Sequence, residues 1–346
     1  MGSCLSLVAA ALLLPVAPST AATWGNTDAA FYSSWGFSDD WAVFELGNGN
    51  VQIQNHSLIY GSPTLTLQSN GDTVDPDNIP APPPPPVKGA PKPPAIPAGT
   101  GAGDIGIAGA AGANVKLQVQ TSRVGNVIVN NASGGTISAN IDNLNSVASV
   151  TSRDLTKDVT AANNLSSTLA ALATSTTGLM SSNAALSNPM TVSGPPGPPP
   201  PPKGPPGNQY GTLNLNNQNL TLTATNTTPV VFNLGTFNIN KNSILTLSGS
   251  ADSEFVFNIY GGDINMNQNS GIVLTGGLTP ADVIFNNIAG TKPGDGPAIT
   301  NHSYLSGIIL ATQQSVNVGQ QSIVFGAVIS NGLTLNDHSI IESPDN

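Results

Sequence analysis

The feature of this sequence that most restricts its fold is a short pattern that occurs six times. The pattern reads polar, apolar, polar, two turn-like residues, Ser, and then two apolar residues, with one extra Gly in the third copy. The copies are Gln52–Ile59, Asn238–Leu245, Asn265–Val273, Ala298–Leu305, Asn317–Val324 and Thr334–Ile341. A chain with such an internal repeat is expected to stack similar units, each burying its apolar side against the next.

The spacing of the copies indicates a β-solenoid. The last five copies start at 238, 265, 298, 317 and 334, so the intervals are 27, 33, 19 and 17 residues. A basic coil of roughly 18 residues, with insertions in the longer intervals, explains these numbers, and coils of this kind stack about 4.8 Å apart. The central apolar residue of each copy should point inward. Asn and Gly supply the left-handed backbone conformations that the corners need.

The rest of the chain is predicted to complete a single domain over residues 22–346. Strand-like alternation is common, and 39% hydrophobic residues suffice for a core. Residues 151–173 are expected to form one long helix that packs on the β-helix through Leu155, Val159, Leu165 and Leu169. Proline-rich tracts at 79–98 and 194–207 are expected to be polyproline II insertions, since proline cannot donate to a sheet ladder.

The first 21 residues are typical of an export signal. An apolar stretch from Leu5 to Val16 precedes the small residues Ser19 to Ala22, and the stretch is short for a membrane span. We therefore expect a secreted protein, either free or associated with the cell surface, with no membrane insertion after signal removal. The single cysteine, Cys4, lies within the signal, so no disulfide framework is expected.

The charge of the chain argues against nucleic acid as a partner. The formal net charge is −10, with nine Lys and Arg residues, and no basic stripe is present. The same charge argues against binding to an anionic membrane surface.

The residue types that carry catalysis do not form a recognisable constellation. His56, His302 and His338 all occupy the turn position before the Ser of the repeat, so they are interpreted as turn residues, a stacked metal-binding His ladder being the alternative. The carboxylates are scattered, and Arg123 and Arg153 are the two arginines. We expect no enzyme activity, no cofactor and no metal.

The outward polar positions of the repeat are the candidate binding site. They should form ladders along one flat face: Gln52, Gln54, Asn238, Asn240, Asn265, Asn267, Asn317, Thr334 and Asn336. One interpretation is that the amides only bond to one another from coil to coil. The other is that a regular, nearly uncharged array binds an extended target such as a glycan, another protein or ice.

Several short motifs, in this order, resemble the secreted ice-binding-like family and its choice-of-anchor A relatives. They are Trp41–Leu46, Ile59–Gly61, Gly103–Ile107, Leu165–Leu172, Val231–Leu234, Phe255–Gly262, Ser306–Ala311 and Val324–Ile329. The resemblance covers roughly residues 36–343. It implies a right-handed, discontinuous β-helix with one long helix along its side. One branch of the family binds ice, and the other consists of surface adhesins.

From the sequence, the main hypothesis is a non-enzymatic extracellular binding, adhesin-like or matrix protein that acts through its polar face. Ice binding is the alternative, because the visible ladder is rich in Asn rather than Thr. A solenoid enzyme that degrades polysaccharides is the third. Self-association through the ends of the solenoid is also expected.

Overall fold

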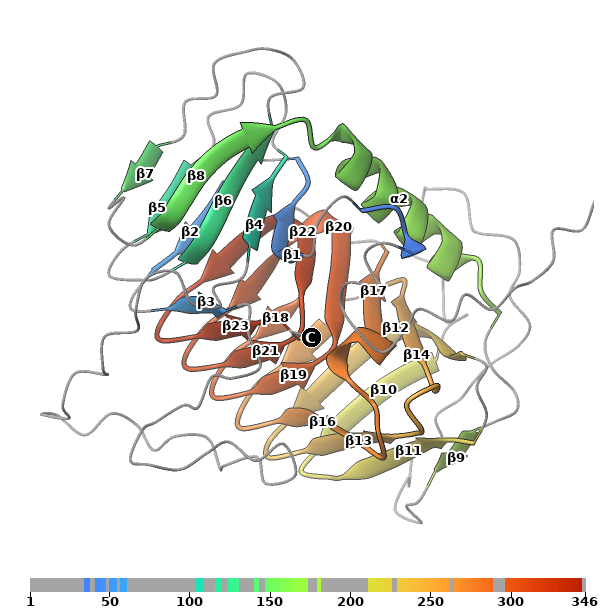
Figure 1. Ribbon diagram of the computed structural model, residues 1–346. Helices are drawn as coiled ribbons and strands as arrows, with labels where there is room; N and C mark the ends of the chain where they lie inside the picture. Colours follow the sequence, from blue (N-terminus) through green and yellow to red (C-terminus); the bar gives the residue numbers. More distant parts are fainter. Residues whose placement is uncertain are drawn as a thin grey trace, which may run out of the picture.

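The computed structural model describes residues 34–37, 41–47, 50–54, 57–60, 104–108, 116–119, 124–130, 140–142, 147–173, 179–181, 211–225, 229–261, 264–288 and 296–343. Over these residues the chain is mainly β, with one α-helix on its side (Figure 1). The strands form stacked coils with three faces. Two faces belong to one 15-stranded sheet, because three long strands bend through both, and the third is an 8-stranded sheet.

The first face lies under the helix, and we call it the helix-covered face. Along the stack its order is β12, β14, β17, β20, β22, β1, β4, β6 and β8, all parallel. Its strands are β1 (Trp41–Glu45), β4 (Asp104–Ile107), β6 (Val124–Asn130), β8 (Val147–Arg153), β14 (Phe255–Ile259), β17 (Val283–Asn287) and the first parts of β12 (Val230–Asn240), β20 (Ile308–Val318) and β22 (Val328–Leu335).

The second face contains the second parts of the same three long strands, and we call it the amide face. Its other strands are β2 (Asn50–Ile53), β5 (Lys116–Val119), β7 (Asn140–Asp142), β10 (Gly211–Asn216), β15 (Ile264–Met266) and β18 (Ala298–Ile299). All of its pairings are parallel.

The third face is the 8-stranded sheet, and we call it the threonine face. Its strands are β3 (Leu58–Tyr60), β11 (Leu220–Ala224), β13 (Ile244–Ser248), β16 (Gly271–Thr275), β19 (Tyr304–Ser306), β21 (Ile323–Phe325), β23 (Ile340–Glu342) and the antiparallel β9 (Leu179–Ser181) at one end. A short 3-10 helix, η2 (Pro280–Asp282), precedes β17.

The repeat sets the register of the coils as predicted. Asn238 pairs with Asn265, Asn265 with Ala298, Ala298 with Asn317, and Asn317 with Thr334, so each interval advances the stack by one coil. The apolar residue after each of them is fully buried, which confirms the inward column: Ile239, Met266, Ile299, Val318 and Leu335. Among the described residues, 249–254 and 276–282 lengthen the two longer intervals and connect strands of the threonine face to strands of the helix-covered face.

The order of the coils in space differs from their order in the chain. Val43 in β1 pairs with Val328 in β22, Gln52 pairs with Thr334, and Leu58 pairs with Ile340. The N-terminal coil therefore stacks on the C-terminal coil on all three faces. Segments before and after the helix therefore pair with one another in both sheets.

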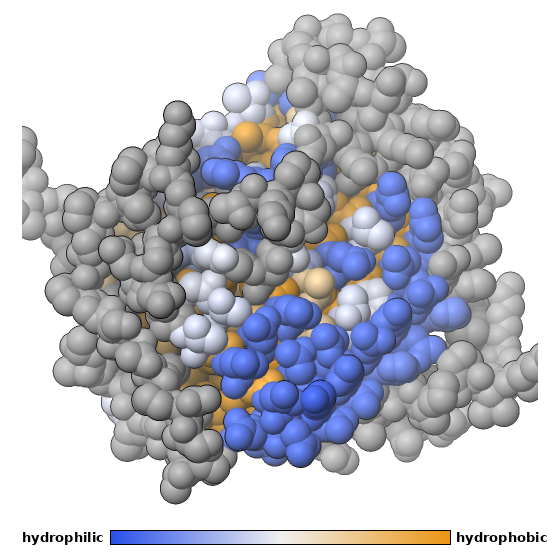
Figure 2. All heavy atoms as spheres, turned by 180° about the vertical axis from the view of Figure 1, so that it is seen from behind, coloured by the Kyte–Doolittle hydropathy of each residue, from blue (hydrophilic) through white to orange (hydrophobic). Residues whose placement is uncertain are grey.

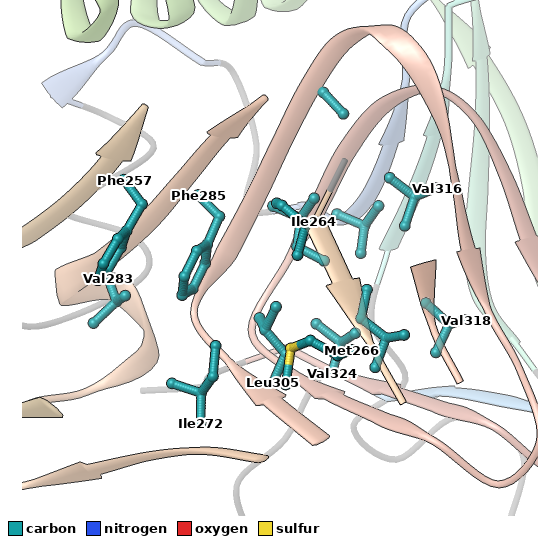
Figure 3. Packing of buried hydrophobic residues seen from close by; sticks show 14 of the residues in the cluster. Phe257, Ile264, Met266, Ile272, Val283, Phe285, Leu305, Val316, Val318 and Val324 are labelled. Carbon is teal, nitrogen blue, oxygen red and sulfur yellow. The ribbon is translucent and has the colours of Figure 1, made fainter. Parts of the chain in front are cut away.

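The core contains an aromatic stack that follows the coil spacing. The rings of Phe232, Phe257 and Phe285 are nearly parallel, with centroid distances of 4.9 and 5.0 Å. These distances match the roughly 4.8 Å between neighbouring strands. Phe237 packs edge-on against Phe257 and Phe285. Figure 3 shows Phe257 and Phe285 side by side next to the aliphatic residues of the core.

The helix is shorter than expected. The structure has α2 at Thr156–Ala170, whereas the predicted range began at 151; residues 151–153 instead end β8. Asp154 Oδ1 accepts a hydrogen bond from the Thr156 N–H, which satisfies one free donor at the first turn. The predicted contacts are confirmed, since Leu155, Leu165 and Leu169 are buried and Val159 packs partly against the same cluster.

A ladder of three asparagines joins α2 to the β-helix. Asn286 Nδ2 donates to Asn258 Oδ1, and Asn258 Nδ2 donates to Asn233 Oδ1, each at 2.9 Å. The same three amides donate to the carbonyls of Ser166, Leu169 and Leu172. Every third residue of a helix rises about 4.5 Å, close to the strand spacing of about 4.8 Å. One carbonyl of α2 or of the turn that follows it therefore meets one amide on each of these three coils.

Candidate functional site

The amide face carries the polar positions predicted from the sequence. Asn317 is exposed, and the other eight predicted site residues are half-buried on the outward side of their strands or directly after them. One column is in register across nine coils: Asn214, Asn238, Asn265, Ala298, Asn317, Thr334, Gln52, Gln118 and Asp142. The structure therefore brings the predicted residues together on one side of the molecule.

The remaining predicted residues follow in a second column beside the corner. Backbone hydrogen bonds link Asn267 N to Ile239 O, Asn336 N to Val318 O, and Gln54 N to Leu335 O. Each of these residues thus continues the strand ladder by one position. Figure 2, seen from behind, shows a broad hydrophilic region on that side of the molecule.

The amides of the first column do not bond to one another as the buried ladder does. In the part of the chain that the structure describes, Asn214, Asn238, Asn265 and Asn317 make no hydrogen bond between side chains. Coil-to-coil amide bonds occur instead among Asn233, Asn258 and Asn286 under the helix. Asn214, Asn238, Asn265 and Asn317 therefore present their amides on the outward side of the strands without side-chain bonds to one another.

Sequence reasoning missed Asn214, Gln118 and Asp142 of the first column and Asn216 of the second. Asn214 and Gln118 lie in register with the predicted residues, and Asn216 pairs with Asn240. The alternation of apolar and polar residues in β10 and β5 carries the same signal. What was absent is the Ser-containing turn, by which the copies were recognised.

The corner between the amide and threonine faces is built from pairs of left-handed residues. Positive φ angles occur at Lys241 and Asn242, and the pattern recurs at Gln268/Asn269, Asn301/His302, Gln320/Gln321 and Asp337/His338. His302 and His338 therefore occupy turn positions, as predicted from the repeat, and His56 lies outside the described residues. Within the described part of the chain, no group of three or more His, Cys, Asp or Glu is arranged to hold a metal.

The Ser that follows each corner turns its hydroxyl into the solenoid. These serines are almost fully buried: Ser57, Ser243, Ser270, Ser303, Ser322 and Ser339. Ser303 N donates to Ser322 Oγ, and Ser322 N donates to Ser339 Oγ, so the hydroxyls link neighbouring coils. The invariant part of the repeat is thus structural.

The threonine face presents hydroxyl and aliphatic groups together. Two outward rows are in register on its first three parallel strands: Thr221, Thr246 and Val273, then Thr223, Ser248 and Thr275. Thr275 is exposed and the other five are half-buried. Half-burial holds these side chains between their neighbours while part of each reaches solvent.

A third outward row on this face is apolar. Ile244, Gly271, Tyr304, Ile323 and Ile340 are in register across five coils. Each is the first residue after the Ser of the repeat. Burial raises the pKa of the Tyr304 phenol, in keeping with a ring packed among these neighbours.

Charge is nearly absent from the threonine face. Among the outward residues whose side chains the structure describes, Glu342 is the one charged group. The buried carboxylates lie elsewhere. Asp158 accepts a hydrogen bond from the Trp41 indole, and Asp282 accepts from Thr279.

No helix of the described residues is long and apolar enough to cross a membrane.

No family model matches this chain, and neither does any curated protein. The chain is similar to the crystal structure of an ice-binding protein from the Antarctic ascomycete Antarctomyces psychrotrophicus, with 12% identity and a TM-score of 0.37, over 86% of this chain and 96% of that one. It is also similar to an ice-binding protein from an Arctic yeast, with 16% identity and a TM-score of 0.41, over 68% of this chain and 89% of that one. The glycosylated form of the yeast protein gives 15% identity and a TM-score of 0.40 over the same shares.

Proposed function

We propose that this protein binds an extended, repetitive surface without chemical turnover, and that the surface is ice. The observation that carries the proposal is the threonine face, where rows of Thr, Ser and aliphatic side chains repeat at the strand spacing with one described charge, Glu342. Ice offers water in a fixed array and no charged groups. A flat face with hydroxyls and methyl groups at regular intervals suits such a target better than a cleft would.

The physical basis is many weak contacts on a rigid frame. Half-buried side chains lose little further freedom on binding, so the entropic cost of ordering them is small. Few charges need to lose their hydration shells, which would be costly without paired partners. Each contact contributes little, and affinity comes from the number of coils that engage together.

A second candidate function is adhesion to a polar polymer, and the amide face favours it. Its outward column is in register, and Asn214, Asn238, Asn265 and Asn317 make no hydrogen bonds to one another, so each of these four coils offers a side-chain amide. A glycan or an extended protein segment could use them. In this case the amide face, not the threonine face, would carry the activity.

Thermal hysteresis of the purified protein tests the first proposal and separates it from the second. Thr246 and Asn238 belong to the same coil and lie on opposite sides of one corner, so Thr246→Tyr and Asn238→Tyr are matched substitutions. We expect Thr246→Tyr to abolish hysteresis while Asn238→Tyr retains it, with equal melting temperatures. Loss through Asn238→Tyr alone would assign the activity to the amide face. Absence of hysteresis from the unsubstituted protein would reject ice as the target.

Finer features of the chain belong to the same proposal. We take the coils to be right-handed, because crossovers between parallel strands of one sheet are almost always right-handed. Residues 1–21 are taken as a cleaved export signal, which places the protein outside the cell. The proline-rich insertions 79–98 and 194–207 lie outside the described residues and remain predictions.

A further inference from the structure

We propose that Asn164 carries an N-linked glycan. It begins the triplet Asn164-Leu165-Ser166, which matches the acceptor pattern Asn-x-Ser/Thr of proteins that pass through a eukaryotic secretory pathway. The inference is independent of what the protein binds. It depends on export, which the first 21 residues predict.

Asn164 lies on the side of α2 that faces away from the β-helix, where there is room for a glycan. Leu165 and Ser166 face the β-helix and are buried, whereas Asn164 is exposed together with Thr160 and Thr168, one turn before and after it. Within the described part of the chain its amide makes no hydrogen bond. A sugar attached to Nδ2 would point away from the β-helix and displace no protein contact.

The two other acceptor triplets that begin at described asparagines are placed differently. Asn219 Oδ1 accepts a hydrogen bond from Ile244 N at 2.9 Å and so holds the start of β13. Asn301 is a left-handed corner residue whose Nδ2 donates to Thr300 Oγ1. Asn219 and Asn301 both lie beside the threonine face. A glycan there would be next to the extended surface that this face is proposed to bind. A glycan on α2 lies on a different side and leaves both candidate faces accessible.

The reaction needs a lipid-linked oligosaccharide as its co-reactant. The Asn164 Nδ2 forms a bond to the anomeric carbon of the oligosaccharide, and the bond from that carbon to the diphosphate oxygen breaks. The amide gives up one proton, and lipid diphosphate leaves. Ser166 Oγ is bonded to Asn286 Oδ1 in the folded protein, so the transfer must precede the packing of α2, as it does during export.

The test is peptide mapping of the full chain secreted from a eukaryotic host. Peptide-N-glycosidase should remove the glycan and convert Asn164 to Asp, which mass spectrometry of that peptide detects. Asn164→Gln should remove this one glycan, whereas Asn163→Gln, next to it but outside the triplet, should retain it. Ser166→Thr keeps the acceptor pattern and should also retain it.

Two results would overturn the proposal. One is an unmodified Asn164 in the secreted chain, and the other is an unchanged glycan content in Asn164→Gln. Peptides that contain the other acceptor triplets are mapped in the same digest, so a glycan elsewhere is not mistaken for this one. Circular dichroism of Asn164→Gln, with an unchanged melting temperature, shows that any difference reflects the sugar and not the fold.

Discussion

The ring of Tyr304 occupies the space in which a side chain at Gly271 would stand. The two residues are paired on neighbouring strands of the threonine face, and a Cβ built on Gly271 would overlap the Tyr304 ring. Glycine is needed here for close approach and not for its backbone conformation. Gly271 and Tyr304 lie between Ile244 and Ile323 in the apolar row. The shape of the face at this point therefore depends on both residues.

The first prediction concerns this pair. Gly271→Val should force the Tyr304 ring outward and destabilise the protein by about 1–3 kcal/mol, as overpacked sites do. Tyr304→Ala should also destabilise, but the double variant should cost less than the sum of the two single changes. Urea unfolding of all four proteins measures this coupling. Strict additivity would show that the two side chains do not compete for the same space.

The second prediction concerns the inward column of the amide face. Leu335 is fully buried, so Leu335→Ala should reduce the free energy of unfolding by about 2–5 kcal/mol. Asn336 is the matched outward neighbour, and Asn336→Ala should reduce it much less. Chemical denaturation compares the two. Equal losses would mean that the inward and outward sides are assigned the wrong way round.

The third prediction concerns the asparagine ladder under α2. Asn258→Leu removes the middle amide and leaves the Leu169 carbonyl and two neighbouring amides short of partners. Each buried polar group left unsatisfied costs about 1–3 kcal/mol, so we expect marked destabilisation and early loss of helix signal. Asn265→Leu, in the outward column, serves as the control and should have little effect. Hydrogen exchange in α2 reports whether the helix detaches first.

The fourth prediction is a pH dependence set by Asp282. Burial raises the pKa of this carboxyl, while hydrogen bonds from Thr279 act in the opposite direction. The folded protein therefore holds this proton more tightly than the unfolded chain, whose Asp titrates near 3.8. The contribution to stability is full below that value and is lost as the pH rises through the folded pKa. Asp282→Asn should remove this loss, as melting temperatures between pH 3 and 7 would show. An identical profile in the variant would contradict the assignment.

The fifth prediction concerns the first proline-rich insertion. Replacing residues 80–97 with a short Gly/Ser linker should leave the melting temperature almost unchanged, because proline gives no ladder hydrogen bonds and loop closure depends weakly on length. A scanning calorimetry comparison of the two chains is sufficient. A large drop would show that the tract packs on the β-helix.

The parts of the fold that could be predicted are those in which polar and apolar residues alternate along a strand. Ile239, Met266 and Ile299 each lie between two polar residues in a repeated frame, so their inward direction follows from the period of a strand. The same reasoning did not identify the threonine face. After each Ser the repeat has two apolar residues, and the sequence pattern did not show which of the two points inward. The structure shows that the first, such as Ile244 or Ile323, points outward and the second, such as Leu245 or Val324, inward.

Other features depend on distant contacts that leave no local signal. The bonds between Asn258 and Leu169 join a strand to a helix far away in the sequence, and nothing in either segment identifies the other. The helix was predicted to begin at residue 151, and Thr and Asp, as at Thr151 and Asp154, are common at helix starts. In the structure, the pairing of β8 with β6 overrides that preference.

The stacking of β1 on β22 has a consequence for how this chain is made. Trp41 and Phe44 leave the ribosome long before the strand that supports β1, at Val328–Ser330, is synthesised. The first coil thus waits for nearly the whole polypeptide before it gains a neighbour on that side. Trimming the C-terminus should therefore damage the N-terminal coil more than the middle coils, which are built from consecutive segments. Two segments far apart in the sequence thus form one seam of the molecule.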